Sequence, residues 1–174
     1  MFVSWSAFPQ FERDAFSHYE PELHLPKKLF TGTHGYKFEW QKYVAPALFA
    51  YTAGAFQGTN EALMHHYNGF QNRFPNANPQ FWDPRESWTN KWELGPDGKP
   101  IVGQERFWLS SSALVPFTDG YHLTDSGNYL FLNAAYSFIP EHQGKPFGIK
   151  VCEILGIWVM RKAGFHTTYS YLFK

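Results

Sequence analysis

The chain has 174 residues, with 15 basic and 15 acidic side chains and therefore a formal net charge of zero. This length suits one domain with a buried core, and the neutral charge argues against binding to a nucleic-acid backbone. The single cysteine, Cys152, excludes a disulfide within these residues and a cysteine-based zinc cluster.

Residues 1–42 are predicted to form an N-terminal arm, followed by a helical domain over 43–174. Prolines and glycines interrupt the arm, and the only helix expected within it is a short one over Phe11–Tyr19. The first residues reach the charged run Glu12–Asp14 without a basic segment or a long apolar one. We therefore expect no cleavable signal peptide.

The first long helix is predicted over residues 45–67, with Pro46 tolerated in its first turn. Small residues recur along it at every fourth position, namely Ala50, Gly54, Gly58 and Ala62. The Gly54-x-x-x-Gly58 pattern lets two helices approach closely in a membrane, although it also occurs in tightly packed soluble helices. Glu61 and His65, one turn apart beside this stripe, either face the neighbouring helix or simply bind each other.

The connection over residues about 68–117 is predicted to be long, irregular and rich in aromatic residues, with a turn and a short hairpin at GPDGKP. Trp82, Trp88 and Trp92 are candidates for an interface with a partner protein, a lipid surface or a sugar. The alternative, which we favour modestly, is that these rings pin the connection onto the helices.

A second helix is predicted over residues 118–138, with Thr118 or Asp119 as N-cap and Pro140 as a stop. Polar side chains at steps of three or four form a seam along it: Asp119, His122, Ser126, Tyr129 and Asn133. Such a seam faces either water, as on an ordinary amphipathic helix, or a polar site between helices.

The third helix is predicted from about Gly148 towards Tyr171, with a possible bend at Gly164. Glu153 and His166 are thirteen residues apart, which places them on roughly opposite faces of a straight helix. We therefore assign His166 to the candidate site and interpret Glu153 as an ordinary polar or ion-paired residue. The predicted fold class is mainly α, a small bundle of about three helices.

Together the three helices predict a polar site that contains Glu61 and Asp119 as catalytic carboxylates and His65, His122 and His166 as metal ligands. Imidazole and carboxylate groups suit zinc, iron or manganese, and bundle sites of this kind are known. The Glu-x-x-His repeat of carboxylate-bridged metal proteins is absent, and so are a P-loop, a G-x-S-x-G elbow and an HExxH motif. The alternative is that these polar groups are structural.

Membrane association is favoured narrowly. The small-residue stripe and the aromatic content of 20% favour a membrane, whereas the negative mean hydropathy and the charged pair Arg161–Lys162 argue against three complete crossings. The strings GAFQGTNEALMHHY, NANPQFWDPRESW, TDGYHL and GFHTTY resemble a group of small, uncharacterised bacterial membrane proteins over roughly residues 43–172. That resemblance implies a membrane location and no particular activity.

Two functions from different classes follow. The first is a small membrane-associated helical protein whose polar site performs metal-dependent hydrolysis or oxidation of a lipid-like substrate. The second is a non-catalytic structural or assembly subunit, of viral origin among other sources, that binds neighbours through its aromatic connection and N-terminal arm. The expected partners are membrane lipid, a partner protein or further copies of the chain. A third hypothesis, a soluble carbohydrate-binding module, rests on the tryptophans alone.

Overall fold

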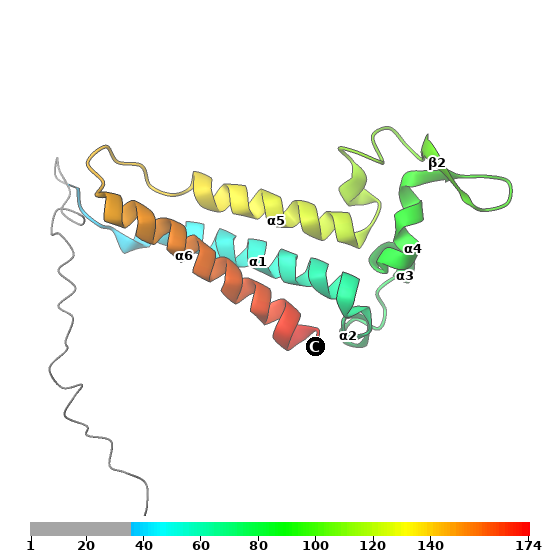
Figure 1. The fold of residues 1–174 in the computed structure, drawn as a ribbon, viewed down its shortest axis with the longest axis horizontal. Helices are drawn as coiled ribbons and strands as arrows, with labels where there is room; N and C mark the ends of the chain where they lie inside the picture. The colour runs from blue at the N-terminus through cyan, green and yellow to red at the C-terminus, as the bar shows by residue number, and fades with distance from the viewer. Residues whose placement is uncertain (1–35) are drawn as a thin grey trace, which may run out of the picture.

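The fold is mainly helical, as the sequence predicts, and is built on three long helices (Figure 1). The structure, a computed structural model, describes residues 36–174. Helix α1 comprises Val44–His65, α5 comprises Gly120–Ser137 and α6 comprises Phe147–His166. Most of the predicted arm, including the short helix at Phe11–Tyr19, lies outside the described residues.

The ends of the long helices lie within a few residues of the predicted positions. A 3-10 turn, η3 (Trp40–Tyr43), leads into α1, and Asp119 is the N-cap of α5. Helix α6 continues through Gly164 to His166, and the irregular geometry comes later, in the π-helical turn η6 (Thr167–Leu172). The change expected at Gly164 therefore falls a few residues later, in a turn that still contacts α1: the hydroxyl of Thr168 donates to the carbonyl of Ala55 at 3.1 Å.

Helix α1 is central and packs against both α5 and α6. Between α1 and α6 the two backbones come into contact, because glycines on each helix face the backbone of the other. A Cβ atom on Gly54 would lie 2.7 Å from the carbonyl carbon of Arg161, and one on Gly164 would lie 2.9 Å from the amide nitrogen of Ala55. The small-residue stripe predicted from the sequence is thus a close helix–helix contact.

The connection between α1 and α5 is more ordered than the sequence indicates, and it packs at one end of the three helices (Figure 1). It contains α2 (Tyr67–Arg73), α3 (Pro79–Trp82), α4 (Pro84–Ser87), the 3-10 turns η4 (Trp88–Lys91) and η5 (Val115–Phe117), and the antiparallel hairpin of β1 (Trp92–Leu94) with β2 (Pro100–Glu105). The side chains of Asn78 and Asp83 cap α3 and α4, each followed by a proline. The predicted hairpin is confirmed.

The bundle buries small and polar side chains and exposes large apolar ones. On α5 the buried residues are Gly120, Thr124, Asn128 and Ala135. Large apolar side chains of the same three helices are exposed, among them Leu130, Leu155 and Trp158. Soluble proteins usually show the opposite distribution in their helical cores. Among the helices of residues 36–174, none is both long enough and apolar enough to cross a membrane.

Candidate functional site

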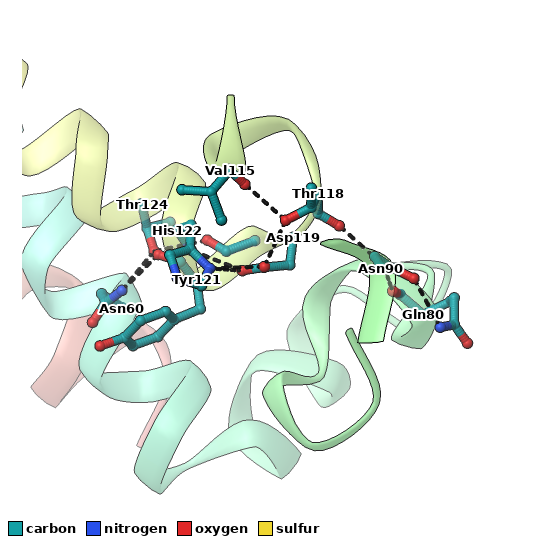
Figure 2. Close-up of polar contacts among 10 residues, drawn as sticks. Asn60, Gln80, Asn90, Val115, Thr118, Asp119, Tyr121, His122 and Thr124 are labelled. Atoms are coloured by element: carbon teal, nitrogen blue, oxygen red, sulfur yellow. Dashed lines mark hydrogen bonds and ion pairs between the residues drawn. The ribbon is translucent and has the colours of Figure 1, made fainter. Parts of the chain in front are cut away.

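The best-defined polar site is the first turn of α5, where Asp119 is 1% exposed (Figure 2). Its carboxylate accepts a hydrogen bond from the backbone N–H of His122 at 2.8 Å and one from the hydroxyl of Thr118 at 2.9 Å. The Nδ1 atom of His122 lies 2.8 Å and 2.9 Å from the two carboxylate oxygens. The sequence thus predicts this N-cap correctly, and the cap also holds an imidazole ring.

This arrangement fixes the orientation of His122. A carboxylate at Nδ1 favours the tautomer that has its proton there, so Nε2 is left free as a proton acceptor or ligand. The His122 side chain is 30% exposed, whereas that of Asp119 is 2% exposed. The pair therefore combines a buried carboxylate with a partly exposed imidazole, an arrangement that can serve a general base.

Neighbouring elements hold the first turn of α5 in place (Figure 2). The amide of Asn60, on α1, donates to the carbonyl oxygen of Tyr121 at 2.8 Å and to the hydroxyl of Thr124 at 3.1 Å. The amide of Asn90, in the connection, donates to the carbonyl oxygen of Thr118 at 2.9 Å. The Asp119–His122 pair consequently lies where α1, α5 and the connection meet.

The five residues of the predicted metal site divide into separate groups. Glu61 and His65 form a pair with 3.4 Å between Oε2 and Nε2, and both side chains are substantially exposed. His166 lies 3.2 Å from the hydroxyl of Ser170 and is exposed. Within residues 36–174, no three His, Cys, Asp or Glu side chains are grouped so that they could hold a metal ion. A bound zinc, iron or manganese ion stays a prediction from the sequence.

The three candidate interface tryptophans differ in their surroundings. The ring of Trp82 packs on Phe70, with 5.3 Å between centroids, and lies directly against Gly120, where a Cβ atom would have no room. Trp92 is half-buried beside Lys91, and Trp88 is exposed. Trp82 thus joins the connection to α5, as the pinning alternative expects, and Trp88 is the ring of the three that is open to a partner.

A second polar cluster, at the other end of the bundle, was not anticipated from the sequence. Glu153 on α6 and Lys145 in the preceding loop form an ion pair of 2.8 Å, with side chains 7% and 4% exposed. The Tyr43 hydroxyl donates to the same carboxylate oxygen at 2.6 Å, and Lys145 also donates to the carbonyl of Pro140. Burial raises the pKa of Tyr43, and the hydrogen bond to Glu153 raises it further.

This cluster joins three parts of the chain: the start of α1, the α5–α6 loop and α6. The interpretation of Glu153 as an ion-paired residue is confirmed. Its partner could not be found from helical spacing, because Lys145 lies in the segment EHQGKPFG, which the sequence marks only as a loop. The sequence contains one weak indication of this ion pair, which is that Lys145 lies eight residues before Glu153, a lone glutamate in an apolar helix.

Comparisons with models of protein families, with curated proteins and with solved structures find no match to this chain. We therefore infer function from the chain's own residues and contacts. Two features stand out among the described residues: the anchored Asp119–His122 pair and the inverted distribution of apolar side chains over the bundle.

Proposed function

We propose that the protein is membrane-associated, that the outer faces of its three long helices contact lipid hydrocarbon, and that the Asp119–His122 pair is its acid–base site. The observation that carries the first part is the inverted bundle, with small and polar groups inside and large apolar groups outside. Lipid tails are as apolar as leucine, so helices in a membrane pack through small residues and interhelical hydrogen bonds.

The interior of the bundle fits this environment. Gly54 and Gly58 on α1 both face the backbone of Phe165 on α6 at contact distance, and Gly164 on α6 faces the backbone of Ala55 on α1. The buried Asn128 of α5 accepts a hydrogen bond of 3.2 Å from the guanidinium of Arg161. Because this hydrogen bond holds Arg161 between the helices, its charge does not have to face lipid. The energetic cost of Arg161 in a membrane, which argues against a membrane location, is therefore smaller.

The exterior of the bundle is apolar over much of α1 and α5 and over the middle of α6, with the exposed Lys150 and Lys162 on either side of that middle stretch. The exposed large apolar side chains of the three helices and their ends include Val44, Leu48, Met64, Tyr129, Leu130, Tyr136, Phe138, Phe147, Val151, Ile154, Leu155, Trp158 and Val159. Residues 44–60, 126–140 and 154–160 contain no charged side chain. So many exposed apolar side chains on a small protein indicate contact with a membrane or with another protein.

Three polar side chains on these helices each donate a hydrogen bond within their own helix. Asn133 donates to the carbonyl of Tyr129 at 2.9 Å, Ser137 to that of Asn133 at 2.8 Å, and Thr52 to that of Leu48 at 2.9 Å. Water would satisfy such groups equally well, but in hydrocarbon an internal partner is necessary. This bonding pattern therefore removes a cost that the polar residues would otherwise impose in lipid.

The inward polar residues also contribute to the low hydropathy of α5. A window average counts Thr124 and Asn128 together with the residues on the outer face, although both are buried. The hydropathy of the whole helix therefore understates how apolar its exposed surface is. We propose association through these surfaces.

For the chemistry we propose that His122 acts as a general base on a lipid-like substrate, with Asp119 as the group that positions it. The pair lies at the end of the bundle where the connection packs, opposite the α5–α6 loop (Figure 1). The structural test is the tautomer of His122, read from its ring ¹⁵N chemical shifts. We expect the Nδ1–H form in the native chain and a shift towards the Nε2–H form in Asp119→Ala; identical spectra would contradict the role of Asp119.

Membrane association is tested by co-flotation of the full chain with phosphatidylcholine vesicles. We expect the native chain to float, and Leu155→Glu, on the outer face of α6, to float about 100-fold less strongly, because a carboxylate in lipid costs about 3 kcal/mol more than leucine. Leu94→Glu is the matched control, since Leu94 on the hairpin is 59% exposed and Leu155 is 55% exposed. A detergent-free monomer that stays with the aqueous phase would contradict the proposal.

The second candidate function is that of an assembly subunit, and the exposed rings of Trp88 and Trp108 favour it. The same apolar surface would then be covered by a partner protein or by further copies of the chain. This alternative predicts a defined oligomer without detergent and no flotation with vesicles. The co-flotation experiment, combined with the measured molar mass, therefore separates the two functions.

A further inference from the structure

A cleft of about 640 Å³ opens where α1, α2 and the C-terminal segment meet, and it has no part in the acid–base site described above. Its walls include Phe56 on α1, Phe70 on α2, Trp82 on α3 and Phe173 near the C-terminus. The volume lies within the range of roughly 300–1,000 Å³ that is typical of small-molecule sites.

The walls are apolar, although three threonines line them. The hydroxyl of Thr52 donates to the carbonyl of Leu48, that of Thr59 to Ala55, and that of Thr124 to Gly120. Each of these hydroxyls therefore already donates a hydrogen bond within its own helix, and the threonines contribute mainly methyl groups to the cleft. Together with the aromatic rings they form a surface suited to a flexible aliphatic chain rather than to a polar ligand.

One end of the cleft is different in character, because Arg73 and Asn76 line it. Arg73 is the last residue of α2 and is exposed. Its side chain makes no hydrogen bond and no ion pair with any residue of the described part, 36–174. A guanidinium group that is free in this way can bind a carboxylate through two parallel hydrogen bonds, and the amide of Asn76 supplies a further donor.

We propose that this cleft binds a long-chain fatty acid anion, with the aliphatic chain between α1, α2 and the C-terminal segment and the carboxylate at Arg73. The apolar walls explain the choice of an aliphatic chain, and Arg73, the one cation among the described residues that line the cleft, explains the choice of an anionic head group. The inference goes beyond the proposed function, because a cleft of this kind would bind a fatty acid whether or not the bundle is in lipid.

The native fluorescence of Trp82 offers a direct test, since bromine atoms quench a tryptophan only at contact distance. The full chain, at a fixed concentration of non-ionic detergent, is titrated with dibromostearate. Trp82→Phe identifies the share of quenching that arises in the cleft. Arg73→Gln removes the cation at the rim, and Arg106→Gln is the matched control, because Arg106 is equally exposed and lies away from the cleft.

We expect saturable quenching that is largely absent in Trp82→Phe, an affinity about tenfold lower in Arg73→Gln, and no change in Arg106→Gln. The corresponding brominated alcohol, which lacks the charge, should bind native protein about as weakly as the acid binds Arg73→Gln. Quenching that rises without saturation would overturn the proposal, because it reports partition into detergent. Equal affinities of Arg73→Gln and Arg106→Gln would overturn the role of the cation. None of these outcomes depends on flotation with vesicles.

Discussion

The contact between α1 and α6 makes Gly54 the position at which one methyl group should have the largest effect. A Cβ atom there would lie 2.7 Å from the carbonyl carbon of Arg161 and 2.9 Å from the amide nitrogen of Phe165, and closer still to the carbonyl oxygen of Arg161. Non-bonded atoms prefer about 3.5–4.0 Å, so Gly54→Ala requires the helices to separate by about 1 Å.

The expected loss of stability can be worked out from two opposing effects. Overpacking usually costs about 1–3 kcal/mol, and the upper end applies here, because the opposing atoms are backbone and cannot change rotamer. Alanine is about 1 kcal/mol better than glycine inside a helix, which offsets part of this cost. We therefore expect a net loss of about 2 kcal/mol in the free energy of unfolding, and a Tm lower by about 4–8 °C for a chain of this size.

Gly156, on α6, provides a matched control for Gly54. A Cβ atom on Gly156 would meet nothing within 4 Å. Gly156→Ala should therefore gain the helix propensity without the clash and raise the Tm by about 2–4 °C. Thermal unfolding followed by far-UV circular dichroism, in one buffer for all variants, measures both. If Gly54→Ala were as stable as Gly156→Ala, the close packing of α1 on α6 would be refuted.

Three further predictions concern the polar groups. Glu153→Leu leaves Lys145 buried without its partner and should cost about 3–5 kcal/mol in chemical unfolding, whereas adding Lys145→Met should restore most of the loss. Because the pKa of Tyr43 is raised in the folded state, its contribution to stability is complete below pH of about 10 and falls as the pH rises further. The Tyr43→Phe variant should therefore lose stability more slowly than the native chain above that pH. Parallel curves of stability against pH for the two proteins would contradict this. The hydrogen bonds from Arg85 lower the pKa of Asp83. The stability that this pair contributes is therefore present above pH of about 3.9 and is lost as the pH falls through the folded-state pKa. The Asp83→Asn variant should flatten that part of the acid unfolding curve.

The long helices and the stripe of small residues could be predicted because local patterns determine them. Pro46 in a first turn, Asp119 at an N-cap and a four-residue repeat of small side chains each act within one helix. The short helices α3 and α4 carry comparable local signals, since Asn78 and Asp83 each precede a proline and cap the turn that follows. The prediction of an irregular connection over residues about 68–117 underestimates these caps.

The polar seam predicted on α5 is offset from the line of residues that the helix actually buries. The prediction joined Asp119 and His122 to Tyr129 and Asn133, but the latter two are exposed, and the buried line runs through Thr124 and Asn128. Chemical polarity alone could not locate the packed face, because small and polar side chains are the ones that this bundle buries. A rule that places large apolar residues inside selects the wrong face.

The Lys145–Glu153 pair could not be predicted because it depends on how the α5–α6 loop folds back over α6. Nor could the sequence predict that Glu61–His65 and Asp119–His122 form two separate pairs, because their separation depends on the relative position of α1 and α5. Residue types suggest the chemistry of such groups, whereas tertiary packing decides which of them meet.

The central claim is that the outer face of α6 contacts lipid, and a fluorescent label on that face measures this most directly. In a Cys152→Ser background, Leu155→Cys carries an environment-sensitive fluorophore, and Lys99→Cys, at the hairpin turn, carries the same label as control. On addition of vesicles that contain bromine-labelled lipid, we expect the emission at position 155 to shift to the blue and to be quenched, while position 99 stays unchanged. No shift at position 155, or equal shifts at both positions, would contradict the account.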